Sequence, residues 1–434
     1  MQTPIADFLE KYEDSGMIRF HMPGHKGKAD PYDITEVNGA DSLYEADGII
    51  RESEENAAAL FGSKRTLYSA EGSSLSIRAM LFLALKNGKG RKIIAGRNAH
   101  KAFLYAAALL DLDVCWLMPK ESNSLLSCHI EAEELEELLS HTAEKPIAVY
   151  LTSPDYLGGM ADIRSLSAVC HKHGVPLLVD NAHGAYLRFL ESDLHPLSLG
   201  ADMCCDSAHK TLPVLTGGAY LHIGKDAPNL FYENAKQAMA LFGSTSPSYL
   251  ILRSLDLANK VLAEENAFPA MAKTVAEIKN KLKANGWQIM ESEPLKITVK
   301  APKDLTGFAL AENLRKNGIE CEYADADFLV LMPSPMNTKN ELEKLVSALG
   351  KNELPDAAVQ TAFMPLPKRA MSIREAIFAP HIRIKTEEAL GKICAAPTVS
   401  CPPAIPIAVS GEIIDENIMA LFRRYGIGEV EVLR

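Results

Sequence analysis

The sequence lacks the features that mark a membrane protein or a disulfide-stabilised scaffold. No stretch reaches the roughly 18 apolar residues that cross a bilayer, and residues 1–12 lack the charged and then apolar pattern of a signal peptide. The eight cysteines include no Cys-x-x-Cys pair, so we expect buried thiols in a reducing compartment, with neither disulfides nor a metal site. These absences predict a cytoplasmic protein with no membrane partner.

Positive charge is also scarce. The chain has 45 basic against 56 acidic residues, a net charge of -11, and no tract rich in Lys and Arg, so we expect no nucleic-acid partner. An acidic surface attracts cationic substrates, but it is equally typical of an ordinary soluble protein, and the charge does not decide between them. The length of 434 residues predicts two or three domains.

Short apolar runs alternate with helical patterns between residues 66 and 222, which is typical of a mostly parallel sheet with helices on both faces. The runs cover residues 66–70, 92–96, 114–119, 147–152, 176–182, 203–207 and 219–223. We expect an α/β protein in four parts. These are an N-terminal arm (1–45), a large domain (46–255), connector helices with a small α/β domain (256–355) and a C-terminal domain (356–434).

In such sheets the ligand site lies at the carboxyl ends of the strands, where two ionisable residues stand out. Lys210 follows the run 203–207, and burial there would lower the pKa of its amine and make it a nucleophile toward an aldehyde. Asp180 ends an apolar run, and a carboxylate buried there needs a cationic partner such as a pyridinium nitrogen. A surface lysine and a helix-capping aspartate are the ordinary alternatives for each residue taken singly.

Two further loops at the same edge suit a cofactor. Gly72, Ser73 and Ser74 open a helix, where backbone N–H groups and hydroxyls can bind a phosphate, although many helices start this way only for capping. His100 follows another strand and could stack on a flat ring, whereas a lone loop histidine is more often only solvated.

Together these segments resemble one family, the fold type I pyridoxal-5'-phosphate (PLP)-dependent ornithine/lysine/arginine decarboxylases, in the short form without an N-terminal receiver-like domain. The motifs that carry the resemblance are HMPGHKGK (21–28), YSAEGSS (68–74), RNAHK (97–101), VDNAHGA (179–185), DSAHKTL (206–212), STSPSYLILRSLD (244–256) and, more weakly, CPPAIPIAVSGE (401–412). The resemblance implies the PLP-dependent transferase fold and decarboxylation of lysine, ornithine or arginine to the amine and carbon dioxide.

The resemblance also implies a role for individual residues. Lys210 would hold PLP as a Schiff base, Asp180 would pair with the pyridine nitrogen, and His100 would stack on the ring. Lys210 or a nearby histidine would return a proton to the substrate. The remaining cofactor contacts would be Gly72, Ser73, Ser74, Ser207 and His209 at the phosphate, His183 beneath or beside the ring, and Ser244 and Thr245 at the phosphate of a neighbouring subunit. We therefore expect a homodimer with active sites at the interface.

The sequence departs from the family pattern at three places. Asn181 stands where an acidic residue commonly follows the cofactor aspartate, Tyr186 replaces a second histidine, and Ala404 replaces the glycine of Tyr-Pro-Pro-Gly. These changes leave the choice of basic amino acid open. An aminotransferase or lyase would share Lys210 and Asp180, and a non-catalytic regulator of polyamine metabolism would be expected to lose one of them.

Overall fold

The computed structural model describes residues 1–118, 124–264, 266–355, 366–400 and 404–434. The chain divides into two compact units that alternate along the sequence. The first unit contains residues 1–90, 147–149 and 163–267, and the second contains residues 91–146, 150–162 and 268–434. Neither unit is one continuous segment, so the four contiguous domains stay a prediction. Residue 356, the expected start of the last domain, lies outside the described residues.

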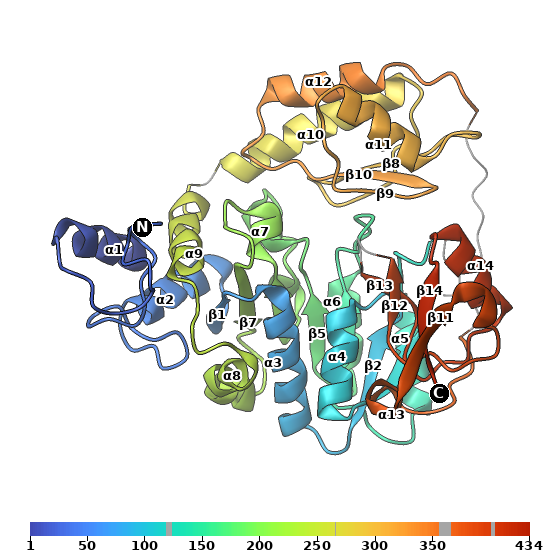
Figure 1. The fold of residues 1–434 in the computed structure, drawn as a ribbon, viewed down its shortest axis with the longest axis horizontal. Helices are drawn as coiled ribbons and strands as arrows, with labels where there is room; N and C mark the ends of the chain where they lie inside the picture. The colour runs from blue at the N-terminus through green and yellow to red at the C-terminus, as the bar shows by residue number, and fades with distance from the viewer. Residues whose placement is uncertain (119–123, 265, 356–365, 401–403) are drawn as a thin grey trace. The chain divides into compact units, whose positions relative to one another are not determined.

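Seven strands form a mostly parallel sheet in the order β1-β7-β6-β5-β4-β2-β3, which confirms the predicted α/β class (Figure 1). The strands are β1 (Arg65–Ser69), β2 (Lys92–Gly96), β3 (Asp113–Leu117), β4 (Val149–Thr152), β5 (Leu177–Asp180), β6 (Met203–Asp206) and β7 (Ala219–Ile223). Each coincides with one of the predicted apolar runs. Because every residue of β5, β6 and β7 is buried, these strands appear in the sequence as continuous rather than alternating apolar runs.

The helices of the first unit bury its strands. They are α1 (Pro4–Asp14), α2 (Ile49–Phe61), α3 (Gly72–Asn87), α6 (Ile163–Lys172), α7 (Ala208–Thr211), α8 (Asn229–Phe242) and α9 (Tyr249–Leu262), with 3-10 turns η1 (Ala185–Phe189) and η2 (Pro196–Leu199). Helix α3 packs along α8, and α1, α2 and α9 pack together (Figure 1). The apolar residues of α3 lie nearly all round the helix, as expected for one buried on most sides.

The register of β5, β6 and β7 positions the residues of interest. Strands β5 and β6 are parallel, with Asp180 opposite Cys205, whereas β6 and β7 are antiparallel, with Cys204 opposite His222. Because β5 and β6 run in the same direction, their carboxyl ends meet at one edge of the sheet. The turns that begin at residues 181 and 207 therefore start side by side.

The second unit contains β2 and β3 and three small antiparallel sheets, of order β8-β10-β9, β11-β14 and β12-β13. The remaining elements are α4 (Lys101–Leu110), α5 (Ala132–His141), α10 (Ala267–Ala284), β8 (Ile297–Lys300), α11 (Gly307–Lys316), β9 (Tyr323–Ala324), β10 (Phe328–Leu331), α12 (Lys339–Leu349), α13 (Ile373–Phe378), β11 (His381–Lys385), η3 (Thr386–Glu388), β12 (Thr398–Ser400), β13 (Ile405–Ala408), α14 (Glu416–Arg424) and β14 (Glu429–Leu433). Helix α11 packs on β9, β10 and α12. Helix α12 begins at a reciprocal capping box of Thr338 and Glu341, the signature of a stable helix start.

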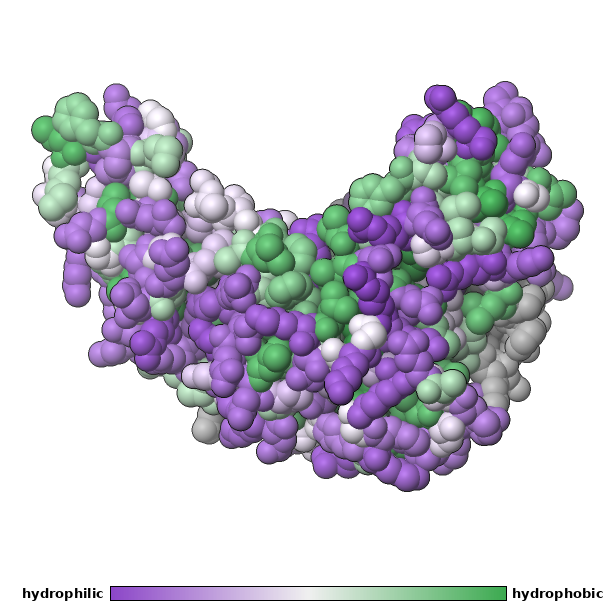
Figure 2. Space-filling view, turned by 90° about the horizontal axis from the view of Figure 1, so that it is seen from below, coloured by the Kyte–Doolittle hydropathy of each residue, from purple (hydrophilic) through white to green (hydrophobic). Residues whose placement is uncertain are grey.

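The surface carries apolar side chains as well as charged ones. Figure 2 shows one face on which hydrophobic groups lie among mostly hydrophilic ones. In the described part of the chain, no helix is both long and apolar enough to cross a membrane. The N-terminal arm exposes four large apolar side chains close together in sequence: Met17, Ile18, Phe20 and Met22.

Candidate active site

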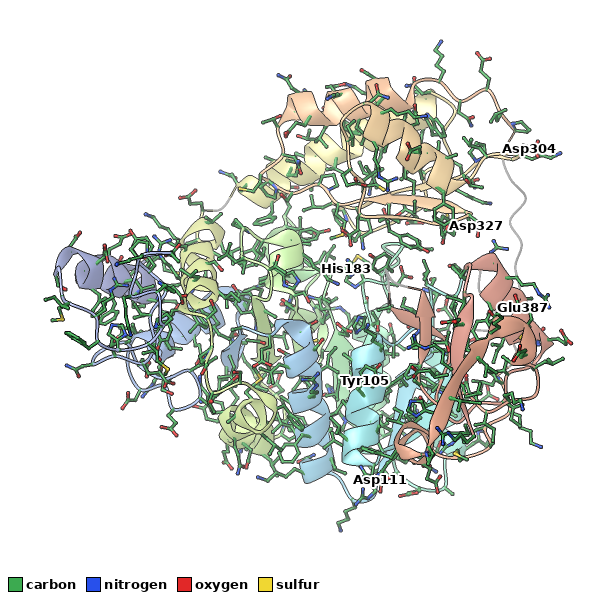
Figure 3. All side chains as sticks on the ribbon, in the orientation of Figure 1. Tyr105, Asp111, His183, Asp304, Asp327 and Glu387 are labelled. Atoms are coloured by element: carbon green, nitrogen blue, oxygen red, sulfur yellow. The ribbon has the colours of Figure 1, made fainter. Side chains whose placement is uncertain are left out.

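Lys210 and His183 meet at the sheet edge of the first unit. Lys210 lies on α7, one turn after β6, and its Nζ lies 3.0 Å from Nε2 of His183. His183, labelled in Figure 3, lies beside α7 and is 5% exposed, while Lys210 is half-buried. An amine and an imidazole at this distance can share a proton, which is the relation that general acid–base chemistry requires.

Asp180 ends β5 and is only 2% exposed. Its Oδ1 accepts hydrogen bonds from the backbone N–H of Ala182, at 3.2 Å, and from the thiol of Cys205, at 3.5 Å. Burial raises the pKa of Cys205 well above its usual value, and the nearby Asp180 adds to this shift, so this sulfur stays a protonated donor. A buried carboxylate is thus held at the carboxyl end of β5.

The start of α3 is open to an anion. Within the described residues no side chain caps this helix, and a Cβ added to Gly72 would meet no atom within 4 Å. Gly72 has a positive φ of 68°, which glycine adopts without strain, and its N–H donates to the carbonyl of Gly217 at 2.7 Å. The hydroxyl of Ser207 donates to that of Ser73 at 2.8 Å. Hydroxyls of two loops therefore meet at a positive helix end, which suits a phosphate.

The other predicted phosphate contacts make local hydrogen bonds. His209 uses Nδ1 and its backbone N–H to contact the carbonyl of Gly218, at 2.9 and 3.1 Å. Ser244 and Thr245 are exposed, and the backbone N–H of Ser244 donates to the carboxylate of Glu71 at 2.6 Å. The Ser244–Thr245 segment is thus anchored beside the start of α3 in its own chain.

His100 belongs to the second unit, where it caps α4. Its Nδ1 accepts a hydrogen bond from the backbone N–H of Ala102 at 3.1 Å, which fixes the plane of the imidazole. The backbone N–H of the next residue, Lys101, donates to the carbonyl of Ala404 at 3.1 Å. The loop with His100 therefore lies against the C-terminal segment, of which Cys401, Pro402 and Pro403 lie outside the described residues.

No role was predicted from the sequence for Arg97, which binds that C-terminal segment through hydrogen bonds and an ion pair. Its guanidinium donates to the carbonyls of Pro406 and Ile407, at 3.0 and 3.3 Å, and pairs with Glu412 at 3.3 Å. Arg97 and Glu412 are both almost fully buried. In the sequence, a role for these two residues could have been inferred from their place in motifs that resemble the family, since Arg97 begins RNAHK (97–101) and Glu412 ends CPPAIPIAVSGE (401–412).

The three departures from the family pattern occupy different surroundings. Asn181 donates from Nδ2 to Oδ1 of Asp206 at 2.7 Å, and Tyr186 is fully buried in η1. Ala404 has φ +60°, a left-handed conformation that costs an L-residue with a Cβ roughly 1–2 kcal/mol. A glycine, which has no Cβ, would adopt this conformation without that cost.

Known proteins resemble the chain in both sequence and fold. Residues 3–329 match the model of the Orn/Lys/Arg decarboxylase major domain. An arginine decarboxylase of Bacillus subtilis is 29% identical over 470 residues, which cover 98% of this chain and 94% of that protein.

Solved structures show the same architecture. The lysine decarboxylase of Francisella novicida superposes with a TM-score of 0.85 at 17% identity, over 100% of this chain and 81% of that one. A serine palmitoyltransferase of Sphingomonas wittichii gives a TM-score of 0.59 at 15% identity, over 80% and 83% of the two chains. These likenesses identify the fold as that of the type I PLP enzymes, and the match of the family model over three quarters of the sequence identifies the family. The chain belongs to the Orn/Lys/Arg decarboxylase family.

Proposed function

We propose that this chain is a PLP-dependent decarboxylase that converts lysine, ornithine or arginine into the corresponding amine and carbon dioxide. The observation that carries the proposal is the contact of 3.0 Å between Nζ of Lys210 and Nε2 of His183, at the edge where Asp180 ends its strand. Family membership and the arginine decarboxylase relative support the choice of reaction and of a basic substrate.

The chemistry of the first unit fits PLP. The cofactor presents an aldehyde, a ring nitrogen and a phosphate, and the unit offers an amine on Lys210, a buried carboxylate on Asp180 and an uncapped helix start at Gly72. The open space beside Gly72 leaves room for a phosphate oxygen that a Cβ would fill. Under this proposal Ser73, Ser74, Ser207 and His209 hold the phosphate, and His100 stacks on the ring.

When bound, PLP supplies a conjugated ring that accepts the electron pair released as the α-carboxylate leaves as carbon dioxide. Asp180 has the place and charge to keep a proton on the ring nitrogen, because a buried carboxylate stabilises a neighbouring cation strongly. Lys210 would hold the aldehyde before the substrate amine replaces it. Nε2 of His183 and Nζ of Lys210 would then deliver a proton to the α-carbon.

We also propose that the enzyme works as a homodimer. Met17, Ile18, Phe20 and Met22 are 64%, 84%, 92% and 66% exposed, an unusual density of apolar surface that a second copy would cover. Ser244 and Thr245 would then contact the phosphate bound to the partner subunit. Sedimentation of the wild-type chain tests this, and a monomer at micromolar concentration would contradict it.

A carbon dioxide release assay with lysine, ornithine and arginine tests the function, with the amine product identified. We expect release from at least one of them, dependent on added PLP, and loss of both release and the visible absorbance of bound PLP in Lys210→Ala. Lys64→Ala is the matched control, because Nζ of Lys64 bonds Asn229 at the surface of the same unit. No release from any of the three amino acids would refute the proposal.

A further inference from the structure

The buried carboxylate of Asp206 contacts the turn that follows β5. Asp206 ends β6, and its Oδ2 accepts hydrogen bonds from Nε2 of His195, at 3.0 Å, and from Nε2 of His222, at 3.2 Å. All three side chains are fully buried, and the ring of Phe61 lies 4.4 Å from that of His222. A charge in such surroundings is tolerated only when its oxygens are paired.

The two imidazoles keep Asp206 ionised. Burial alone would raise the pKa of Asp206, but the electrostatic interactions and hydrogen bonds with His195 and His222 outweigh burial, so the pKa lies well below its usual range. Burial also lowers the pKa of His222, which favours a neutral ring. The hydroxyl of Thr66, 2.8 Å from Nδ1 of His222, suits a ring that accepts at Nδ1 and donates at Nε2. Asp206 thus presents a fixed negative charge with one oxygen left for another partner.

That partner is Asn181, the residue after Asp180. Nδ2 of Asn181 donates to Oδ1 of Asp206 at 2.7 Å, and its backbone N–H donates to the carbonyl of Cys205 at 2.9 Å. The carbonyl of Asn181 accepts from the N–H of Gly184 at 2.8 Å, which closes the turn. The turn is tight, because a Cβ on Gly184 would lie 2.0 Å from Oδ1 of Asn181. The side chain of Asn181 is therefore clamped between Asp206 and its own turn.

The same turn carries two residues of the candidate active site. Asp180 precedes Asn181, and His183, which contacts Lys210, follows two residues later. Asp206 in turn directly precedes Ser207 and the helix that carries Lys210. The hydrogen bond from Asn181 to Asp206 thus joins the starts of two of the loops that carry candidate cofactor residues.

We propose that Asp206, which is hydrogen-bonded to His195 and His222, is a positioning residue. Through its hydrogen bond with Asn181 it fixes the conformation of the turn that carries Asp180 and His183. The inference rests on the proposed function for its consequence, because the turn matters to catalysis only if Asp180 and His183 serve PLP.

Exchanging the two side chains tests the proposal. Asn181→Asp alone places two carboxylates about 2.7 Å apart, where both cannot stay ionised, so the turn should open. In Asn181→Asp with Asp206→Asn the pair is complementary again, because the new amide at position 206 can donate to the new carboxylate and still accept from both imidazoles. Asp206→Asn alone removes the charge and makes the amide of Asn181 turn over before it can accept, so exchange in this turn should also rise, by less than in Asn181→Asp.

Hydrogen exchange of the backbone amides at residues 181–184 is measured in the full chain without and with PLP. We expect at least about tenfold faster exchange in Asn181→Asp, the size of losing roughly 1.5 kcal/mol from a charged hydrogen bond, and a return to within about threefold in the double variant. Asp202→Asn is the matched control. It removes another buried aspartate, bonded to His171 and to the N–H of Leu177, and should leave these amides unchanged.

Three results would overturn the inference. The first is amide exchange at the wild-type rate in Asn181→Asp, and the second is exchange in the double variant that is as fast as in Asn181→Asp. The third is one equivalent of bound metal in the purified protein. The last matters because the ligand atoms of His195, Asp206 and His222 lie within 4.8 Å of one another and could hold an ion. The exchange measured without PLP is independent of the proposed function, whereas failure of the wild-type chain to gain visible absorbance with PLP would refute that function separately.

Discussion

Removing Arg97 should loosen the packing of the C-terminal segment within the second unit. The guanidinium makes three hydrogen bonds, to the carbonyls of Pro406 and Ile407 and to Glu412, and it lies over the ring of Trp116 at 5.3 Å. The side chains of Arg97 and Glu412 are 5% and 4% exposed. Breaking a buried pair on one side costs roughly 3–5 kcal/mol, because the remaining charge stays buried without its partner. We therefore expect Arg97→Met to lower the free energy of unfolding of this unit by about that amount.

Trp116 provides a local probe of this region. The chain has two tryptophans, so Trp287→Phe leaves Trp116 as the reporter, and all variants are compared in that background by urea titration of its fluorescence. Arg91→Met is the matched control. Arg91 pairs with Asp111 at 2.9 Å, but the two side chains are 57% and 51% exposed, and such a pair contributes about 1 kcal/mol at most.

A double variant separates charge from packing. Arg97→Met with Glu412→Leu should cost less than the sum of the two single changes, because no charge is then left buried without a partner. The reasoning would be refuted if Arg97→Met destabilised the unit no more than Arg91→Met, or if the two single changes were additive.

Three further predictions concern single residues. Ala404→Gly should raise the thermal midpoint by relieving a φ of +60°, a gain of about 1 kcal/mol, and a lower midpoint would contradict the strain. Burial raises the pKa of Asp256 to about 6 although Ser53, Ile5 and Ala6 donate to it. The native state then binds more protons than the unfolded state between about pH 4 and pH 6, so stability falls by up to about 3 kcal/mol as pH rises through this window. Urea midpoints at pH 4.5 and 7 should differ less in Asp256→Asn than in wild type, and an unchanged difference would count against the shift. His183→Gln should lower kcat by roughly 10²- to 10⁴-fold with little change in KM, as for loss of a proton donor, whereas His171→Gln should leave both constants within about twofold. Equal effects of the two histidine variants in steady-state assays would argue against a role for His183.

Local pattern was enough to predict the sheet and the residues at its edge. The run 203–207 became β6 (Met203–Asp206) and the run 176–182 became β5 (Leu177–Asp180), because buried strands need apolar side chains on both faces. The polar residues that end these runs stand out for the same reason. Roles for Ser244 and Thr245 came only from resemblance, and they stay predictions, as does the stacking role of His100.

Partners brought together by folding could not be read from the sequence. Arg97 meets Glu412 across 315 residues, and Asn181 meets Asp206 across 25, with no periodicity that connects either pair. In the sequence, Asn181 is only a departure from the family pattern. The pairing of β5 with β6 brings the carboxylate of Asp206 next to it.

The sequence by itself determined the fold class and, through the resemblance of its motifs, the family, and it predicts Lys210 and Asp180 as the residues on which a cofactor would depend. The fold class follows from apolar runs of strand length, and the two candidates follow from ionisable residues where those runs end. Only the tertiary structure decided which groups contact the ionisable residues at the strand ends. His183 contacts Lys210, Cys205 donates to Asp180, and His195 and His222 donate to Asp206. The physical reason is that hydrogen bonds and buried charges act over a few ångströms, and strand pairing rather than sequence distance sets which side chains come that close.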